Sequence, residues 1–222
     1  MKYPDDFINK IICGDCLEIV KQIPDKSIDL VLTDPPYGLE YEEQEWDKIV
    51  FSKLIKKIIR EYLRILKDKC FAFIYVPKKR LYELKFLIKE DFEIFIEYRD
   101  WGQLRNNYLI FNCWVPILAI KKGKPKDRGK RPKNIIFSSS ANTSKNEGDF
   151  RRYEHVTPKN LEVMKYLIKN FSDENDLILD PFLGSGTTAV ASQQLHRNYI
   201  GIEISPKYCE IAKQRLRQKV LI

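Results

Sequence analysis

The 222-residue sequence holds 39 Lys and Arg residues against 31 Asp and Glu residues, a formal net charge of +8 at pH 7. Hydrophobic residues make up 44% of the chain and charged residues 32%, which excludes a disordered chain and is typical of one globular domain. There is no apolar run of roughly eighteen residues and no signal-peptide pattern, so we expect a cytoplasmic protein without a membrane span. The basic excess favours a polyanionic partner.

Seven apolar runs predict β-strands, and helical patterns alternate with them. Several runs are continuously apolar and rich in Ile and Val, as expected of central parallel strands that are covered on both faces. Helices are expected over 50–66, from 161 onward, and from Ser205-Pro206, where an N-cap precedes proline at the first helical position. The predicted strands are Lys10–Cys13, Ile28–Thr33, Cys70–Val76, Phe92–Tyr98, Ile110–Ile120, Leu177–Asp180 and Tyr199–Glu203.

This alternation predicts a doubly wound α/β fold, a mixed seven-stranded sheet in one domain over 1–222. We expect Phe92–Tyr98 and Ile110–Ile120 to form its antiparallel edge. The interval 121–154 interrupts the pattern with eight basic residues between 121 and 133, together with Gly and Pro. It is either a solvated loop or a recognition insertion that orders on nucleic acid. On the second interpretation the binding residues are Lys121, Lys122, Lys124, Lys126, Arg128, Arg151 and Arg152.

The five cysteines form an odd set, and most of them lie in apolar surroundings. Such a pattern indicates buried thiols in a reducing compartment. Cys13 and Cys16 make a Cys-x-x-Cys pair, but no second pair or histidine cluster accompanies them. We therefore expect neither a metal site nor a redox site.

The sharpest motif, Thr33-Asp34-Pro35-Pro36-Tyr37-Gly38, directly follows the strand Ile28–Thr33. Ligand sites in open α/β sheets lie at the carboxyl ends of strands. Two prolines fix an extended turn and remove two amide donors, which leaves carbonyl groups free to accept hydrogen bonds. A carboxylate, a rigid carbonyl and an aromatic ring suit a planar group that bears an amine. The structural alternative is a proline-rich turn with an N-capping Asp.

A second motif, Asp180-Pro-Phe-Leu-Gly184-Ser-Gly186-Thr-Thr188, follows the strand Leu177–Asp180. Its glycines allow the backbone to approach a ligand closely and to turn tightly into a helix. The next strand ends at Glu203, where ribose hydroxyls would be bound. The third glycine of a dinucleotide fingerprint and the Gly-Lys-Ser/Thr of a phosphate loop are both absent, so a nucleoside cofactor without phosphates fits best.

Together the two motifs resemble those of the DNA amino-methyltransferases. Their order, with the DPPY motif first and DPFLGSGTT near the C-terminus, is similar to the permuted β class, whose members methylate adenine or cytosine amines. His155-Val-Thr157-Pro-Lys159-Asn resembles the family's HPTxKP segment. Ile12-Cys13-Gly14-Asp15-Cys16 resembles its N-terminal GDA or GDC element.

The resemblance implies a Rossmann-like methyltransferase that transfers a methyl group from S-adenosylmethionine to N6 of an extruded adenine in double-stranded DNA. It implies a companion restriction endonuclease and a place at the nucleoid. Because 121–154 is short for the family's recognition region, a homodimer that shares the recognition surface is an alternative to recognition by that interval alone. The implied catalytic residues are Asp34, Pro35, Pro36 and Tyr37, and the implied cofactor-binding residues are Asp15, Cys16, Asp34, His155, Thr157, Lys159, Asp180, Phe182, Gly184, Ser185, Gly186, Thr187 and Glu203.

Other functions stay open at this point. Cytosine-N4 methyltransferases more often carry Ser at the position of Asp34, which favours adenine. RNA and protein-glutamine methyltransferases more often carry Asn-Pro-Pro-Tyr and place the cofactor motif first. A non-catalytic nucleic-acid-binding relic would be expected to lose motif residues such as Asp34, Gly184 or Glu203, which are all present.

Overall fold

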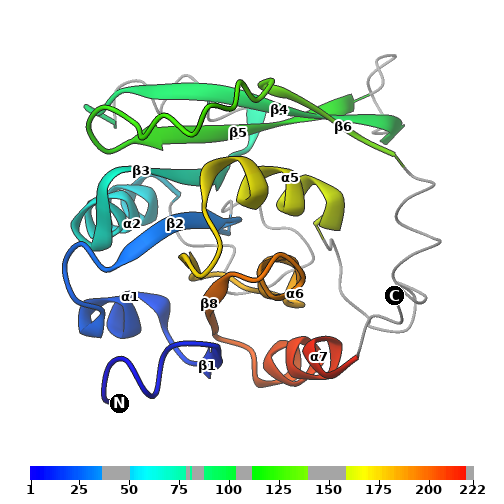
Figure 1. Ribbon diagram of the computed structural model, residues 1–222. Helices are drawn as coiled ribbons and strands as arrows, with labels where there is room; N and C mark the ends of the chain where they lie inside the picture. Colours follow the sequence, from blue (N-terminus) through cyan, green and yellow to red (C-terminus); the bar gives the residue numbers. More distant parts are fainter. Residues whose placement is uncertain (37–50, 79–80, 82–87, 104–111, 140–158, 219–222) are drawn as a thin grey trace.

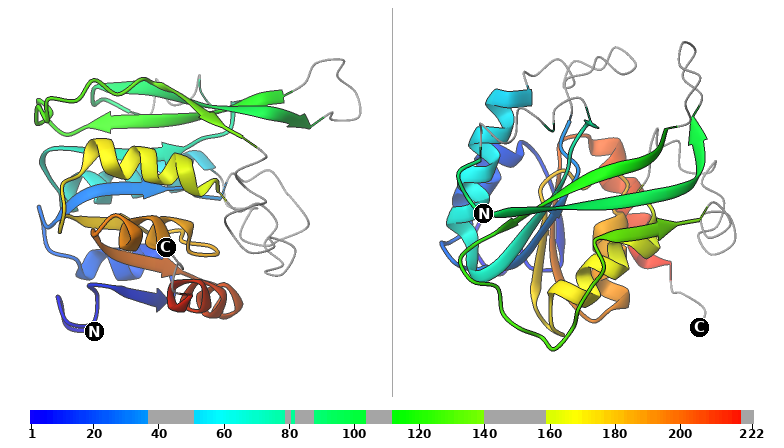
Figure 2. Two further views of the ribbon diagram at one scale, coloured as in Figure 1. Left: turned by 45° about the vertical axis from the view of Figure 1, so that its right-hand side comes forward. Right: turned by 90° about the horizontal axis from the view of Figure 1, so that it is seen from above.

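A mixed sheet of eight strands runs through the computed structural model, and helices cover both of its faces (Figures 1 and 2). The structure describes residues 1–36, 51–78, 81, 88–103, 112–139 and 159–218. The strand order is β1-β8-β7-β2-β3-β5-β4-β6. The strands are β1 (Lys10–Cys13), β2 (Ile28–Thr33), β3 (Leu66–Tyr75), β4 (Phe92–Gln103), β5 (Asn112–Lys121), β6 (Ile135–Ser138), β7 (Leu177–Asp180) and β8 (Asn198–Glu203).

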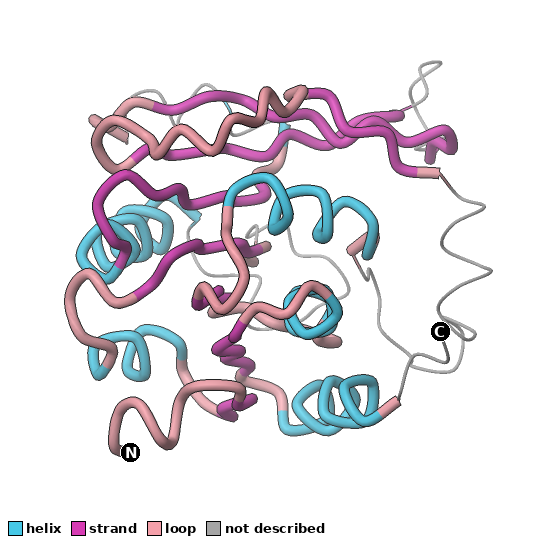
Figure 3. The backbone as a smooth tube through the Cα atoms, viewed as in Figure 1, coloured by secondary structure: helices cyan, strands magenta, loops and turns pink. Residues whose placement is uncertain are grey.

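Two rows of helices enclose the sheet (Figure 3). On one face α2 packs against β3 and contributes Ile58 and Tyr62 to a buried cluster, which α1 and η1 join beside β8. On the other face α5 contacts β2 and β6, α6 contacts β7 and β8, and α6 in turn contacts α7. The ring centroid of Phe171 in α5 lies 4.7 Å from that of Phe73 in β3. The helices are α1 (Cys16–Ile19), η1 (Val20–Gln22), α2 (Phe51–Ile65), α5 (Leu161–Phe171), α6 (Thr187–Gln194) and α7 (Pro206–Arg217).

The doubly wound mixed sheet is confirmed, but the expected count of seven strands is wrong. The additional strand, β6, lies in the interval that was expected to be irregular, and it pairs in parallel with β4 at the edge of the sheet. It has only four residues, of which Ile135 and Phe137 are exposed, so its pattern is too short to separate it from the basic run before it. Strand β3 was predicted to begin at Cys70, but it begins at Leu66. Residues 67–69 are charged, so the hydrophobic pattern showed only the apolar part of the strand that follows them.

The parallel strands β1, β8, β7, β2 and β3 bring their carboxyl ends to one edge of the sheet. In register, Cys13 pairs with Glu203, and Thr33 pairs with Ile74. The two sequence motifs therefore meet at this edge, as expected for an open α/β sheet. None of the helices in the described ranges is long and apolar enough to cross a membrane.

Candidate active site

Asp34 leaves the carboxyl end of β2, between the strands that carry the second motif and the strands β3, β5, β4 and β6. All six residues of β2 are buried, which fixes the point where Asp34 emerges. The Asp34 side chain is 25% exposed and forms an ion pair with Lys159, the residue before the N-cap of α5. Pro35 is buried and Pro36 is partly buried beside it, whereas Tyr37 lies outside the described residues.

Asp180 joins β2, β7 and α6 through a buried carboxylate. Its oxygens accept hydrogen bonds from Thr33 Oγ1 at 2.8 Å, Thr188 Oγ1 at 2.6 Å and the amide of Phe182 at 3.1 Å. Burial raises the pKa of Asp180 to about 6, although these hydrogen bonds favour the ionised form. This carboxylate therefore holds the turn after β7 against the strand that carries Asp34, a role of Thr33 and Thr188 that the local sequence did not reveal.

Asp180→Asn should change how stability depends on pH. The unfolded carboxyl loses its proton near 3.8, whereas the folded one keeps its proton up to about 6. The native state binds more protons between these values, so Asp180 lowers the free energy of unfolding as pH rises from about 4 to about 6. We expect the difference in urea midpoint between the Asn variant and the wild type to grow in favour of the variant over that window. A constant difference would contradict the raised pKa.

Glu203 binds two turns at the carboxyl ends of neighbouring strands. Its Oε2 accepts a hydrogen bond from the amide of Gly184, and its Oε1 accepts one from the amide of Ser205, each at 2.8 Å. Burial raises the pKa of Glu203, and the backbone donors oppose this shift. A carboxylate has about four acceptor sites, and the backbone donors leave room for a ligand hydroxyl.

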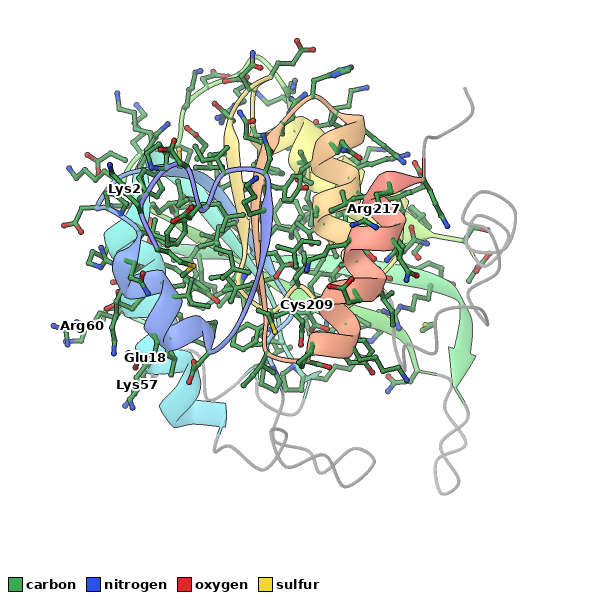
Figure 4. The ribbon with its side chains drawn as sticks, turned by 90° about the horizontal axis from the view of Figure 1, so that it is seen from below. Lys2, Glu18, Lys57, Arg60, Cys209 and Arg217 are labelled. Carbon is green, nitrogen blue, oxygen red and sulfur yellow. The ribbon has the colours of Figure 1, made fainter. Side chains whose placement is uncertain are left out.

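The turn from Gly184 to Gly186 is held from outside by α7, which carries Cys209 and Arg217 (Figure 4). Gly186 has φ +91°, and a Cβ at this position would lie 2.7 Å from Ala212 Cβ. Arg215 donates hydrogen bonds to the Ser185 carbonyl at 2.8 Å and to Thr187 Oγ1 at 3.1 Å. Sequence reasoning missed Arg215, because nothing in α7 itself shows which turn its side chain will meet.

The N-terminal element also reaches this edge. The carboxylate of Asp15 accepts a hydrogen bond from the amide of Leu17 at 2.8 Å and caps α1. Cys16 is buried, and burial raises the pKa of its thiol to about 12, while Cys13 is exposed. In the part of the chain that the structure describes, no group of three or more His, Cys, Asp or Glu side chains is placed to hold a metal ion.

These residues form a site with the chemistry of a nucleoside ligand. Asp15 and Glu203 place two carboxylates near the ends of β1 and β8, which pair in register at Cys13 and Glu203. Carboxylates repel phosphates but accept hydrogen bonds from hydroxyl and amino groups. Phe182 is partly buried beside them and adds apolar surface. The fit to a phosphate-free nucleoside cofactor is therefore good, although His155 and Thr157 lie outside the described residues.

Comparison with known proteins identifies the family. Residues 28–113 and 96–214 match the N6_N4_Mtase family of DNA methylases. This chain belongs to that family. The type II methyltransferase M.HinfI of Haemophilus influenzae is 30% identical over 96% of this chain and 70% of its own length. M.BamHI of Bacillus amyloliquefaciens is 31% identical over 96% of this chain, which spans only 58% of that relative.

Solved structures agree with the assignment of this chain to the DNA methylase family. The M1.HpyAVI–SAM complex superposes with a TM-score of 0.67 at 26% identity, covering 93% of this chain and 99% of that one. PvuII DNA methyltransferase, described as cytosine-N4-specific, gives a TM-score of 0.77 over 96% of this chain and 87% of its own. At 19% identity the second likeness shows the fold alone. Membership of this family thus establishes that the protein is a DNA amino-methyltransferase. The family includes enzymes for adenine N6 and for cytosine N4.

The basic segment of this DNA methylase, residues 121–133, begins at the opposite end of the strands from Asp34. Strand β5 runs antiparallel to β3 (Figure 1). Lys121 pairs with Phe71 near the amino-terminal end of the buried part of β3. Acidic side chains pair with four of the segment's basic residues there. The ion pairs are Lys121–Glu93 (3.4 Å), Lys122–Asp68 (3.8 Å), Lys126–Asp173 (2.7 Å) and Arg128–Asp173 (3.4 Å).

The structure therefore does not bring the five described residues of the predicted DNA-binding set to the site. Lys121, Lys122, Lys124, Lys126 and Arg128 belong to the opposite edge, where four of them are occupied by acidic partners. Arg151 and Arg152 fall outside the described residues. The sequence pattern showed the density of positive charge but not the acidic residues 68, 93 and 173, which are distant along the chain. A role of these seven residues in DNA binding stays a prediction.

Proposed function

We propose that this DNA methylase transfers a methyl group from S-adenosylmethionine to the N6 amine of adenine in duplex DNA. The observation that carries the proposal is Asp34 with buried Pro35, placed at the carboxyl end of β2 beside a site with the chemistry of a phosphate-free nucleoside. Cytosine-N4 methylation is the second candidate, because the family includes both reactions. The resemblance of Asp34-Pro35-Pro36-Tyr37 to the adenine members favours N6.

The residues of this chain would act on the amine. An aromatic amine is a poor nucleophile, since its lone pair is delocalised into the ring. Hydrogen bonds from the amine to the Asp34 carboxylate and the Pro35 carbonyl favour a pyramidal nitrogen with a localised lone pair. The Asp34 carboxylate can then take the proton that the methylated nitrogen must lose. When bound, S-adenosylmethionine supplies an electrophilic methyl group on its sulfonium.

Positioning supplies much of the acceleration in this proposal. Well-oriented reactants gain roughly 7–11 kcal/mol over the same groups free in solution. Glu203 would bind the ribose hydroxyls of the cofactor and Asp15 its adenine, while the turn 184–186 would hold its methionine part. Asp180 holds that turn to β2 through Thr33, so the cofactor and amine sites keep a fixed relation. The target base must leave the duplex to reach Asp34, an extrusion that costs a few kcal/mol.

We extend the proposal to the partners of the protein. Duplex DNA is the substrate in which the target base lies. A companion restriction endonuclease is inferred from the type II relatives M.HinfI and M.BamHI. The interval 121–154 is short for a recognition region, so a homodimer would enlarge the recognition surface. Sedimentation of the protein alone and with DNA would test for the dimer.

Nucleoside analysis tests the reaction itself. The protein is incubated with S-adenosylmethionine carrying a radiolabelled methyl group and with mixed-sequence duplex DNA, and the DNA is digested to nucleosides. We expect the label in N6-methyldeoxyadenosine and none in an RNA duplex control of the same sequence. Label in N4-methyldeoxycytidine would keep the family and overturn the choice of base. An absence of label in DNA, with cofactor binding shown by equilibrium dialysis, would overturn the proposed function.

A further inference from the structure

The ammonium of Lys159 binds the carboxylate of Asp34, which the target amine would need as its hydrogen-bond acceptor. Lys159 Nζ forms an ion pair with Asp34 Oδ2, and the two side chains are 15% and 25% exposed. An ammonium and an exocyclic amine present the same donor, an N–H group on a small nitrogen. A carboxylate that already accepts a charge-assisted hydrogen bond is a weaker acceptor for a second, neutral donor.

Lys159 combines a fixed backbone with a movable cation. The next residue, Asn160, is buried and caps α5 by accepting hydrogen bonds from the amides of Glu162 at 2.9 Å and Val163 at 3.3 Å. The base of the Lys159 side chain is therefore anchored beside a helix that the aromatic core holds in place. Its four-carbon stem has several rotamers, so the ammonium can leave Asp34 without any movement of the backbone.

The Tyr75 ring gives the ammonium a second favourable contact. Lys159 Nζ lies 4.7 Å from the centroid of this ring, which is fully buried at the end of β3. The Tyr75 hydroxyl and the carboxylate of Glu97 are both buried and interact with one another. Burial raises the pKa of Tyr75 well above its ordinary range, and the charges of Glu97 and Asp34 raise it further. A cation that moves away from Asp34 along this ring therefore stays close to negative charge.

We propose that Lys159 is a positioning residue that holds the amine-binding site of the free enzyme and is displaced by the target amine. The inference rests on the proposed function of Asp34 as the acceptor of that amine. In the free enzyme the ammonium keeps Asp34 paired and competes with water and other donors for its carboxylate. When the base enters, its amine binds Asp34, and Lys159 leaves Asp34 while it keeps its contact with the Tyr75 ring. A base without an amine at that position leaves the ion pair in place, so Lys159 weakens the binding of amine-bearing bases alone, and its removal should increase the preference of the site for them.

Binding of paired duplexes separates this role from a structural one. One duplex carries adenine at the methylated position, and the other carries purine, which lacks only the amine. Their Kd values are measured with S-adenosylhomocysteine present, so no methyl transfer occurs. In Lys159→Met the competitor charge is gone while the length of the side chain is kept. We expect the ratio of the purine Kd to the adenine Kd to rise about fivefold, as for loss of one partly exposed ion pair.

Two further variants complete the design. In Lys159→Arg the guanidinium can bind Asp34 through two hydrogen bonds, so the ratio should fall below that of the wild type and the KM for DNA should rise. Lys165→Met removes a charge from α5 that pairs with Glu162 at 3.2 Å, away from Asp34, and should leave the ratio unchanged.

An unchanged ratio in Lys159→Met would overturn the inference. If the affinity for S-adenosylmethionine fell instead, Lys159 would belong to the cofactor site, as the sequence resemblance implies. Failure of the proposed function is recognised separately, because the wild-type protein would then label no adenine in DNA. If it labels cytosine, the same comparison is made with cytosine and 2-pyrimidinone, and the expected ratios are the same.

Discussion

Asp34→Ala is expected to lower the single-turnover rate of methyl transfer by about 10³-fold, in the range for loss of one group that acts only on the reacting atoms. The Kd for S-adenosylmethionine should change by less than about threefold, because Asp180, Glu203 and the turn 184–186 are untouched. The reason is geometric. Asp34 is the carboxylate at the end of β2, and the Pro35 carbonyl alone leaves one hydrogen of the amine without a charged acceptor.

The matched variants for this prediction separate chemistry from stability. Asp34→Ala also leaves Lys159 without its partner, so the free energy of unfolding is measured in parallel. Asp34→Asn retains the shape and one acceptor oxygen, and we expect a similar loss of rate with a smaller loss of stability. Asp68→Ala removes an exposed carboxylate at the opposite edge, paired with Lys26 at 2.7 Å, and should keep full activity. Undiminished activity in Asp34→Ala would remove Asp34 from the site.

The fold could be predicted where the hydrophobic pattern is long enough to have a period. The strands Lys10–Cys13, Ile28–Thr33 and Leu177–Asp180 are observed with the predicted bounds, and the helix expected over 50–66 is observed as Phe51–Ile65. Strand β6 could not be predicted, because four residues after a basic run carry too little periodicity. Its place outside β4 is set by tertiary pairing, which local sequence does not encode.

The site divides in the same way. Asp34 and Glu203 could be placed at strand ends from local patterns, since the preceding strands are short and mostly apolar. Their partners could not be placed. Lys159 lies 125 positions after Asp34, and its pairing depends on how α5 crosses the sheet. The basic segment shows the same limit, because its acidic partners come from β4, the start of β3 and the loop after α5.

Gly186→Ala should destabilise the protein by about 3 kcal/mol and weaken cofactor binding by more than about tenfold. Two costs combine at this position. The backbone has φ +91°, which L-residues rarely adopt, and the new Cβ would meet Ala212 Cβ at 2.7 Å and Ala212 Cα at 3.1 Å. Relief of the contact requires α6 and α7 to separate, which moves the turn 184–186 away from Glu203. Urea unfolding and equilibrium dialysis with S-adenosylmethionine measure the two effects.

Gly129 provides the matched control, because it shares the backbone conformation but not the crowding. Its φ is +66°, and a Cβ there would meet no atom within 4 Å. Gly129→Ala should therefore cost only the conformational part, about 1 kcal/mol, and leave cofactor binding unchanged. Ala212→Gly in the Gly186→Ala background removes one side of the contact, so the double-mutant cycle should show a favourable coupling of about 1 kcal/mol or more. Equal losses of stability and of cofactor affinity in the two glycine variants, with no coupling to Ala212, would mean that backbone strain alone matters. The packing of α7 against the turn 184–186 would then contribute nothing to the cofactor affinity.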